Sequence, residues 1–370
     1  MILEDTSEKL YNQVADDLRS RIQSGGFGPE GRLPNFKELA VAYNVSMSTI
    51  KKSMQILSEQ NLIVARAGRG TYVNTPDRSA GIASQNRRKV DQDTIGLLVR
   101  DIDGPYFSGI HKGLSDTART LQKRLMVTVS VDDHHQEEMM YQLLQDQVEG
   151  VMVTTMRKSL HGVSVFEKML AQHLPFVILQ DVYDTPTFCF DADNYKGGRL
   201  AAERLLSRGI TKFAAIVGEI GFRVDDMRLQ GFTDGLRDGG VNVDEDCFVL
   251  RCSLGSEATA FDEGYKLGMS LDLKGIGFEG IFLFNDLIAM GFQKALLERG
   301  FSIPDDIVVI GFDNIDRCSE ARVPLTTISV PRREIGQAAF KKLVQIINKE
   351  VKIQPERILL EPELIVRSSA

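Results

Sequence analysis

The sequence lacks the features of membrane, secreted and disulfide-stabilised proteins. No apolar run approaches the roughly 18 residues that cross a bilayer. The first residues, MILEDTSEKL, contain neither a basic nor an apolar signal segment. Only four cysteines occur among 370 residues, and none has CxxC spacing. We therefore expect a cytoplasmic protein with reduced, buried thiols, no metal or cofactor and no membrane partner.

Common catalytic motifs are also missing. GxxxxGK[ST], GxSxG and HExxH do not occur, and no GxGxxG follows the first predicted strand. His134 and His135, followed by Glu137 and Glu138, give the one hint of a metal site. Adjacent histidines diverge on most backbones, so a solvated loop is favoured there. We expect a protein that is not an enzyme, with a sugar-modifying enzyme as a remote alternative.

Basic residues are scarce overall but concentrated near the N-terminus. The net charge of −7 argues against a nucleic-acid partner, yet residues 37–73 carry five Lys or Arg against two Glu, a local charge of +3. Arg87, Arg88 and Lys89 follow in a polar stretch. This asymmetry is typical of a DNA-binding domain attached to a body that does not bind DNA.

The chain is too long for one ordinary core, and three regions differ in pattern. Residues 1–75 are mostly helical with a Gly-rich ribbon, residues 76–93 read as a polar linker, and residues 94–370 alternate apolar strands with amphipathic helices. The alternation predicts an α/β fold with buried, doubly wound parallel strands, enough for two sheets. The expected strands are residues 94–99, 126–131, 150–155, 175–180, 213–217, 280–284 and 307–312.

The first region predicts a winged helix-turn-helix. An apolar stripe in residues 7–24 runs through Leu10, Val14, Leu18 and Ile22, and a second helix is expected over 36–43. Asn44 tolerates a left-handed turn, and Ser46 can cap a third helix. Two β-prone segments, 62–64 and 71–73, then flank a basic glycine-rich tip. A small helical interaction module with a hairpin is the alternative.

Several motifs in this region resemble the GntR-type winged helix-turn-helix. They are Leu10-Tyr11, Arg32-Leu33-Pro34, Glu38-Leu39-Ala40, Val45-Ser46 and Gly68-Arg69-Gly70-Thr71-Tyr72-Val73. The resemblance implies contacts with double-stranded operator DNA from the second helix, the start of the third helix and the wing. The corresponding residues here are Lys37, Ser46, Met47, Ser48, Thr49, Lys51, Lys52, Arg69, Gly70 and Thr71.

Two of these positions depart from the family. Met47 and Lys51 stand where arginines are usual. Arginine can contact guanine bidentately, whereas lysine offers a point charge and methionine an apolar surface. We expect a variant operator, with Met47 either against a thymine methyl or exposed without a base partner.

Residues 94–368 resemble the LacI-type sensor, which is built like periplasmic sugar-binding proteins. The matching motifs are Gly104-Pro105-Tyr106-Phe107, Asp193-Asn194, Arg228-Leu229-Gln230-Gly231-Phe232, Phe284-Asn285-Asp286, Gly311-Phe312-Asp313-Asn314 and Pro324-Leu325-Thr326-Thr327-Ile328. A GntR-type head on such a body is the arrangement of the arabinose-repressor (AraR) subgroup. The resemblance implies two lobes, about 94–190 with 330–355 and about 191–328 with 356–368.

Polar residues directly after predicted strands suggest a ligand site, because open parallel sheets bind ligands at that edge. A polyol needs convergent donors and acceptors and an apolar wall. We expect these from Tyr106, Phe107, Asp181, Asp193, Arg228, Asn285 and Asp313. The structural alternatives are Tyr106 and Phe107 in the core, Arg228 paired with Asp225 or Asp226, Asn285 holding a strand–helix turn and Asp313 capping a loop. For Asp181 and Asp193 a structural role is an equal alternative. The glutamine common after the Leu-Thr-Thr-Ile segment is absent, with only Ser329 there.

These features predict a ligand-responsive transcription regulator. The favoured form is a homodimeric repressor of carbohydrate-utilisation genes that a sugar, a pentose such as arabinose favoured, releases from DNA. An activator and a purine-type regulator that requires a corepressor are the alternatives. A periplasmic transport receptor is disfavoured by the DNA-binding head.

Overall fold

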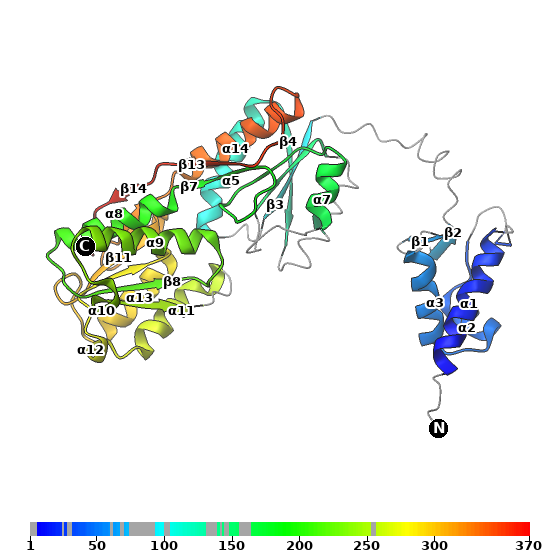
Figure 1. Ribbon diagram of the computed structural model, residues 1–370, viewed down its shortest axis with the longest axis horizontal. Helices are drawn as coiled ribbons and strands as arrows, with labels where there is room; N and C mark the ends of the chain where they lie inside the picture. Colours follow the sequence, from blue (N-terminus) through cyan, green and yellow to red (C-terminus); the bar gives the residue numbers. More distant parts are fainter. Residues whose placement is uncertain are drawn as a thin grey trace. The chain divides into compact units, whose positions relative to one another are not determined.

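The chain divides into two compact units, residues 1–89 and 90–370 (Figure 1). The computed structural model describes residues 6–23, 26–27, 32–59, 62–66, 70–73, 93–99, 104–130, 139–140, 143, 148–154, 164–252 and 257–370. Arg69, residues 74–92 and the His134–Glu138 segment lie outside these ranges. None of the helices within them combines the length and apolar character needed to cross a membrane.

The first unit is a winged helix-turn-helix, as predicted. Its elements are α1 (Thr6–Gln23), α2 (Phe36–Tyr43), α3 (Met47–Glu59), β1 (Ile63–Arg66) and β2 (Gly70–Val73). The antiparallel hairpin pairs Ile63 with Val73. Val14 and Leu18 from the predicted stripe are buried, but Leu10 is 44% exposed, so the buried part of the stripe begins one turn later.

Local hydrogen bonds explain the turn between α2 and α3. Asn35 and Glu38 form a reciprocal capping box that starts α2. Asn44 ends this helix with φ 50°, the left-handed conformation that asparagine tolerates. Ser46 then accepts the Thr49 amide at 3.2 Å and caps α3 as predicted.

The second unit contains two lobes, each built on a six-stranded sheet. Lobe 1 contains β3 (Thr94–Val99), α5 (Pro105–Thr120), β4 (Arg124–Val129), β5 (Gly150–Val153), α7 (Ser164–Ala171), β6 (Phe176–Ile178), β7 (Phe188–Ala192), α14 (Arg332–Ile347) and β13 (Glu356–Leu360). Its strand order is β13-β7-β6-β5-β3-β4, with every pairing parallel.

Lobe 2 has the order β14-β12-β11-β10-β8-β9, in which only β14 is antiparallel. Its strands are β8 (Phe213–Val217), β9 (Cys247–Arg251), β10 (Gly280–Leu283), β11 (Val308–Asp313), β12 (Thr326–Ser329) and β14 (Glu363–Ile365). Its helices are α8 (Asn194–Ser207), α9 (Arg223–Asp238), α10 (Val243–Asp246), α11 (Glu257–Ser270), α12 (Leu273–Ile276), α13 (Asp286–Glu298) and the 3₁₀ turn η1 (Asp316–Ser319). The predicted doubly wound α/β architecture is confirmed.

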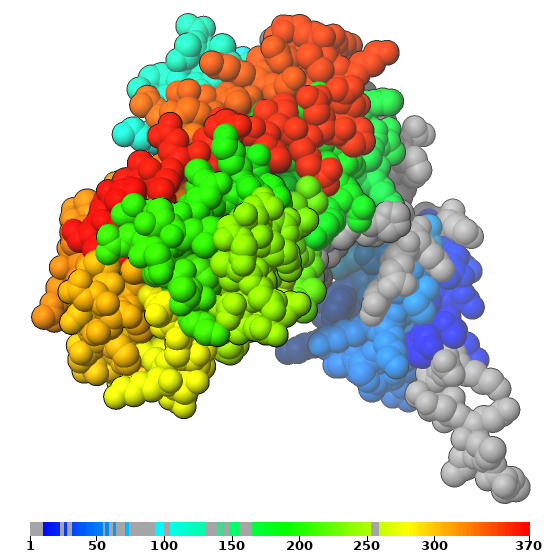
Figure 2. Space-filling model, turned by 60° about the vertical axis from the view of Figure 1, so that its left-hand side comes forward, coloured from blue at the N-terminus to red at the C-terminus, as the bar shows by residue number. Residues whose placement is uncertain are grey.

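The chain crosses between the lobes three times, at β7–α8, β12–α14 and β13–β14. One expected boundary is wrong at the third crossing. Residues 356–360 were assigned to lobe 2, but they form β13, which pairs with β7 in lobe 1. The C-terminal segment, red in Figure 2, therefore runs over both lobes.

Candidate DNA-binding face and effector site

The start of α3, which is predicted to contact DNA, is polar and exposed. Ser46, Ser48, Lys51 and Lys52 are exposed, and Met47 is 40% exposed. Met47 and Lys51 lie one helical turn apart, so both can face the same groove. The apolar side chain of Met47 and the charge of Lys51 are therefore neighbours on α3, at the two positions where arginines are usual in the resembling family.

Three hydroxyls at the tip of α3 are hydrogen-bonded to one another. The Ser46 hydroxyl lies 2.8 Å from those of both Ser48 and Thr49. Thr49 is only partly exposed. The Lys52 ammonium lies 5.3 Å from the centroid of the Tyr11 ring, which places this charge beside α1.

The other predicted DNA contacts flank this helix. Lys37 is exposed on α2. Gly70 and Thr71 lie in the wing strand β2, where the Thr71 carbonyl accepts the Leu33 amide at 2.8 Å. Arg69 lies outside the described residues.

Arg228 is the centre of the predicted effector site in the second unit. It is 6% exposed, and its Nε donates to the Asn194 side-chain oxygen at 2.9 Å. Its Nη1 donates to the Phe284 carbonyl oxygen, and its Nη2 lies 3.6 Å from the Asp313 carboxylate. The guanidinium also lies 3.8 Å from the centroid of the Phe312 ring. The expected alternative, an ion pair with Asp225 or Asp226, is not formed by Arg228.

Close packing of α8 on α9 holds Arg228 in place. A Cβ added at Gly198 would lie 2.1 Å from the Arg228 carbonyl oxygen, and one at Gly231 would lie 1.9 Å from the Tyr195 carbonyl oxygen. The two helices therefore touch backbone to backbone through glycine. This contact fixes the backbone that carries the guanidinium.

Asp313 is the last residue of β11 and is 7% exposed. Its φ of 114° is unusual for a residue other than glycine, and Asn314 follows with φ 53°. Strained backbone of this kind is often found at binding sites. Asp313 thus combines this backbone conformation with a carboxylate 3.6 Å from Arg228.

Tyr106 and Phe107 belong to lobe 1 and pack against the hydrophobic core of the second unit, as the structural alternative for them expected. Both are partly buried at the start of α5, and their rings meet edge to face with centroids 5.3 Å apart. The Tyr106 hydroxyl donates to Asp191 at 3.4 Å. Burial raises the pKa of Tyr106 well above its usual value, and the charges of Asp191 and Asp313 add to the increase. Tyr106 is therefore a neutral hydroxyl at physiological pH.

Three other predicted ligand residues have structural partners. Asp193 caps α8 by accepting the Lys196 amide at 2.9 Å, and Asn285 caps α13 by accepting the Ile288 amide at 2.8 Å. Asp181 is 2% exposed and accepts the Nε atoms of Arg223 and Arg357, each at 2.8 Å. Arg223 belongs to lobe 2 and Arg357 to lobe 1, so Asp181 takes part in an ion pair between the lobes.

Sequence reasoning missed Asp191, Asn194 and Arg332. Asp191 and Asn194 are buried beside Arg228. Arg332 donates to the Pro105 carbonyl in lobe 1 at 2.6 Å and to the Asn314 carbonyl in lobe 2 at 2.9 Å. It follows the position where the family glutamine is absent, and Ser329 there accepts from Asn314 at 3.1 Å. The one available signal was Asp191 itself, a charge within an apolar strand.

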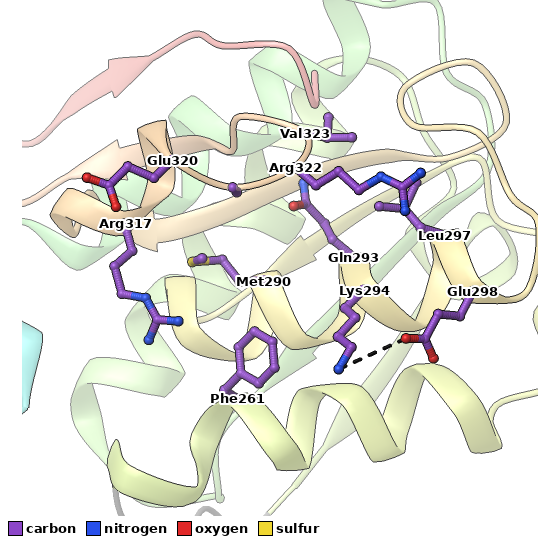
Figure 3. Close-up of a pocket in the computed structure, with 11 residues that line it drawn as sticks. Phe261, Met290, Gln293, Lys294, Leu297, Glu298, Arg317, Glu320, Arg322 and Val323 are labelled. Carbon is purple, nitrogen blue, oxygen red and sulfur yellow. Dashed lines mark ion pairs between the residues drawn. The ribbon is translucent and has the colours of Figure 1, made fainter.

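A separate hollow of about 460 Å³ lies on lobe 2 between α11, α13 and the η1 region (Figure 3). Phe261 and Met290 give it an apolar floor, and Lys294 pairs with Glu298 at its side. It shares no residue with the predicted effector site. The described residues contain no cluster of metal-ligating side chains.

Comparisons with known proteins assign both units. Residues 10–73 match the model of bacterial regulatory proteins of the gntR family, and residues 202–370 match the periplasmic binding protein-like domain. The chain is 26% identical over 370 residues to the arabinose metabolism transcriptional repressor of Geobacillus stearothermophilus, covering 97% of each chain. It is 26% identical over 282 residues to the ribose operon repressor of Escherichia coli, covering 75% of this chain and 82% of that one.

Solved structures of transcription regulators are also similar to this chain. A LacI family transcriptional regulator from Enterococcus faecium with bound ribose is 28% identical, with a TM-score of 0.64 over 75% of this chain and 98% of the other. A CelR–cellobiose complex, 19% identical, has a TM-score of 0.66 over 91% of this chain and 100% of the other, and supports the fold alone.

The fold and these matches define a transcription regulator rather than an enzyme. The chain joins a DNA-binding domain of the GntR family to a periplasmic-binding-protein-like domain of the LacI type, the arrangement of the arabinose repressors.

Proposed function

We propose that this chain is a cytoplasmic, homodimeric repressor of carbohydrate-utilisation genes that a neutral sugar releases from operator DNA. The observation that carries the proposal is the buried Arg228 fork, held by Asn194 and Asp313 at the edge of lobe 2. From lobe 1 the Tyr106 hydroxyl donates to Asp191, which also accepts from Asn194, the partner of Arg228.

The charges favour a neutral ligand. Arg228 lies 3.6 Å from Asp313, and Arg332 and Asp191 add one charge of each sign nearby. The formal charges of these four groups cancel, which disfavours a phosphate or an ammonium group. Carboxylates and arginines instead form paired hydrogen bonds with vicinal hydroxyls, and the Tyr106–Phe107 pair offers a surface for C–H groups. The relatives named for arabinose and ribose favour a pentose.

Control of DNA binding then follows from lobe closure. A sugar that contacts both lobes favours their closed arrangement, and in a dimer this changes the spacing of the two heads. Two heads read a two-fold operator through the Ser46–Lys52 segment, Lys37 and the wing residues Arg69, Gly70 and Thr71. The coupling is reciprocal, so operator must weaken sugar binding by the factor by which sugar weakens operator binding.

Calorimetric titration of a pentose and hexose panel, with operator bound and free, tests the proposal. We expect one pentose to bind, and to bind more weakly when operator is present. Arg228→Gln should abolish this binding, whereas the head variant Lys51→Ala should leave the affinity for sugar without DNA unchanged. Binding of a purine in place of every sugar, or sugar affinity that is independent of operator, would contradict it. Sedimentation of the full chain checks the dimer.

A further inference from the structure

A carboxylate interrupts a fully buried strand of lobe 1. All five residues of β7 are buried, and Asp191 is 3% exposed between Phe190 and Ala192. Burying a carboxylate costs free energy unless hydrogen bonds replace its water. An apolar residue would fill this position at a lower desolvation cost. The hydrogen-bond partners of the carboxylate must therefore explain its presence.

Every partner of Asp191 donates to it. One oxygen accepts the Asp181 amide at 2.9 Å and the Asn194 side-chain nitrogen at 3.2 Å. The other accepts the Ala192 amide at 2.7 Å and the Tyr106 hydroxyl at 3.4 Å. An ionised carboxylate only accepts hydrogen bonds, so it matches all four donors at once.

This acceptor decides which way the Asn194 side chain points. An asparagine amide has an oxygen end and a nitrogen end of the same shape. Here the nitrogen donates to Asp191 and to the Ala192 carbonyl at 3.0 Å, so the oxygen is turned toward Arg228. The Arg228 Nε then donates to that oxygen at 2.9 Å. The order of contacts is Asp191, Asn194, Arg228, Asp313, and it passes from lobe 1 to lobe 2.

We propose that Asp191 is a positioning residue of the effector site, which orients the Arg228 guanidinium through the Asn194 amide and holds the Tyr106 hydroxyl from the other side. The inference rests on the proposed function. It adds a residue, on a strand rather than a loop, that determines how well a sugar fits both lobes.

The sharpest perturbation is Asp191→Asn, which keeps the shape but replaces one acceptor with a donor. At least one of the four donors then faces a donor. The Asn194 nitrogen keeps only the Ala192 carbonyl as an acceptor, so its oxygen is held toward Arg228 less strongly. We expect the dissociation constant of the sugar to rise at least tenfold. The matched control is Thr187→Val, which removes the buried 2.7 Å hydrogen bond from Thr187 to the Phe176 carbonyl just before β7.

Calorimetry on the full chain separates positioning from general damage. Both variants are expected to lower the melting temperature, but only Asp191→Asn should weaken sugar binding. In an Asn194→Ala background, Asp191→Asn should weaken sugar binding much less, because the amide that connects Asp191 with Arg228 is already absent. A change of less than twofold in Asp191→Asn, or full additivity with Asn194→Ala, overturns the inference.

A second readout needs no sugar. The Arg228 Nε–H signal of the ¹⁵N-arginine-labelled chain, identified by its loss in Arg228→Lys, reports the hydrogen bond to Asn194. Asp191→Asn should shift this signal and speed its exchange with water, whereas Thr187→Val should leave it in place. An unmoved signal overturns the inference even if a sugar binds. If no sugar binds the wild type but the signal moves, the proposed function fails while the positioning role stands.

Discussion

Asp181 offers a matched pair of perturbations, because two arginines contact it in the same way from different lobes. Arg223 on α9 reaches it from lobe 2, and Arg357 on β13 reaches it from within lobe 1, each with Nε at 2.8 Å. The Tyr183 hydroxyl adds a second bond between the lobes, to Asp226 at 3.1 Å. We predict that Arg223→Gln weakens sugar binding and that Arg357→Gln does not.

The magnitude follows from the geometry. Two unit charges about 4 Å apart interact by about 4 kcal/mol at an effective dielectric constant of about 20. The Arg223 side chain is 22% exposed while Asp181 is 2% exposed. Desolvation and solvent screening reduce the net contribution to about 1–2 kcal/mol. Loss of this pair should therefore shift the balance between closed and open lobes about tenfold.

Two measurements check this prediction. Calorimetry should show the sugar dissociation constant of Arg223→Gln raised about tenfold, because only closed lobes offer both walls of the site. Small-angle scattering of the sugar-free variant should show a larger radius of gyration. Arg357→Gln should lower thermal stability by a comparable free energy with sugar affinity unchanged. Equal sugar affinities in the two variants would refute the assignment of Arg223 to closure.

Three further predictions concern other parts of the chain. Lys51→Ala should weaken binding to operator and to non-specific DNA by a similar factor. It should also reduce the slope of the logarithm of the DNA-binding constant against log[salt] by about 0.9, as measured by fluorescence anisotropy. Loss of sequence preference with an unchanged slope would contradict this. Burial raises the pKa of Asp225 from 3.8 to about 6, so the folded state binds this proton more tightly, and the contribution of Asp225 to stability falls as pH rises from about 4 to about 6. The free energy of urea unfolding of Asp225→Asn, relative to that of the wild type, should therefore be higher at pH 7.5 than at pH 4. A difference between the two proteins that does not change with pH would refute this direction. Gly198→Ala should cost several kcal/mol, since its Cβ would lie 2.1 Å from the Arg228 carbonyl oxygen, with Gly209→Ala, where nothing lies within 4 Å but φ is 74°, as a milder comparison.

The apolar strands were predictable because parallel strands buried on both faces leave continuous hydrophobic runs. β3 and β8 begin and end where the sequence predicts. β13 was assigned to the wrong lobe because its mostly exposed residues carry no such signal, and its partner β7 is more than 160 residues away. Strand pairing at that separation depends on tertiary contacts rather than on local pattern.

Residue types around the effector site were easier to predict than their partners. Arg228 and Asp313 lie together as the motifs suggested. Asp193 was predicted from the Asp193-Asn194 motif, yet its side chain caps the following helix. The burial of Asp191 depends on Tyr106, Asn194 and Asp181 meeting in space. No spacing along the chain encodes that meeting.

The positive φ of Asp313 has a consequence for anyone who wishes to retarget this regulator. The backbone conformation at φ 114° costs more free energy for a residue other than glycine, asparagine or aspartate. Glycine would relax the backbone but would remove the carboxylate beside Arg228. Few substitutions are therefore open at this position, whatever ligand is wanted. Directed evolution toward a new inducer should leave Asp313 in place and vary the lobe 1 wall at Phe107, where the helix α5 accepts many side chains without backbone strain.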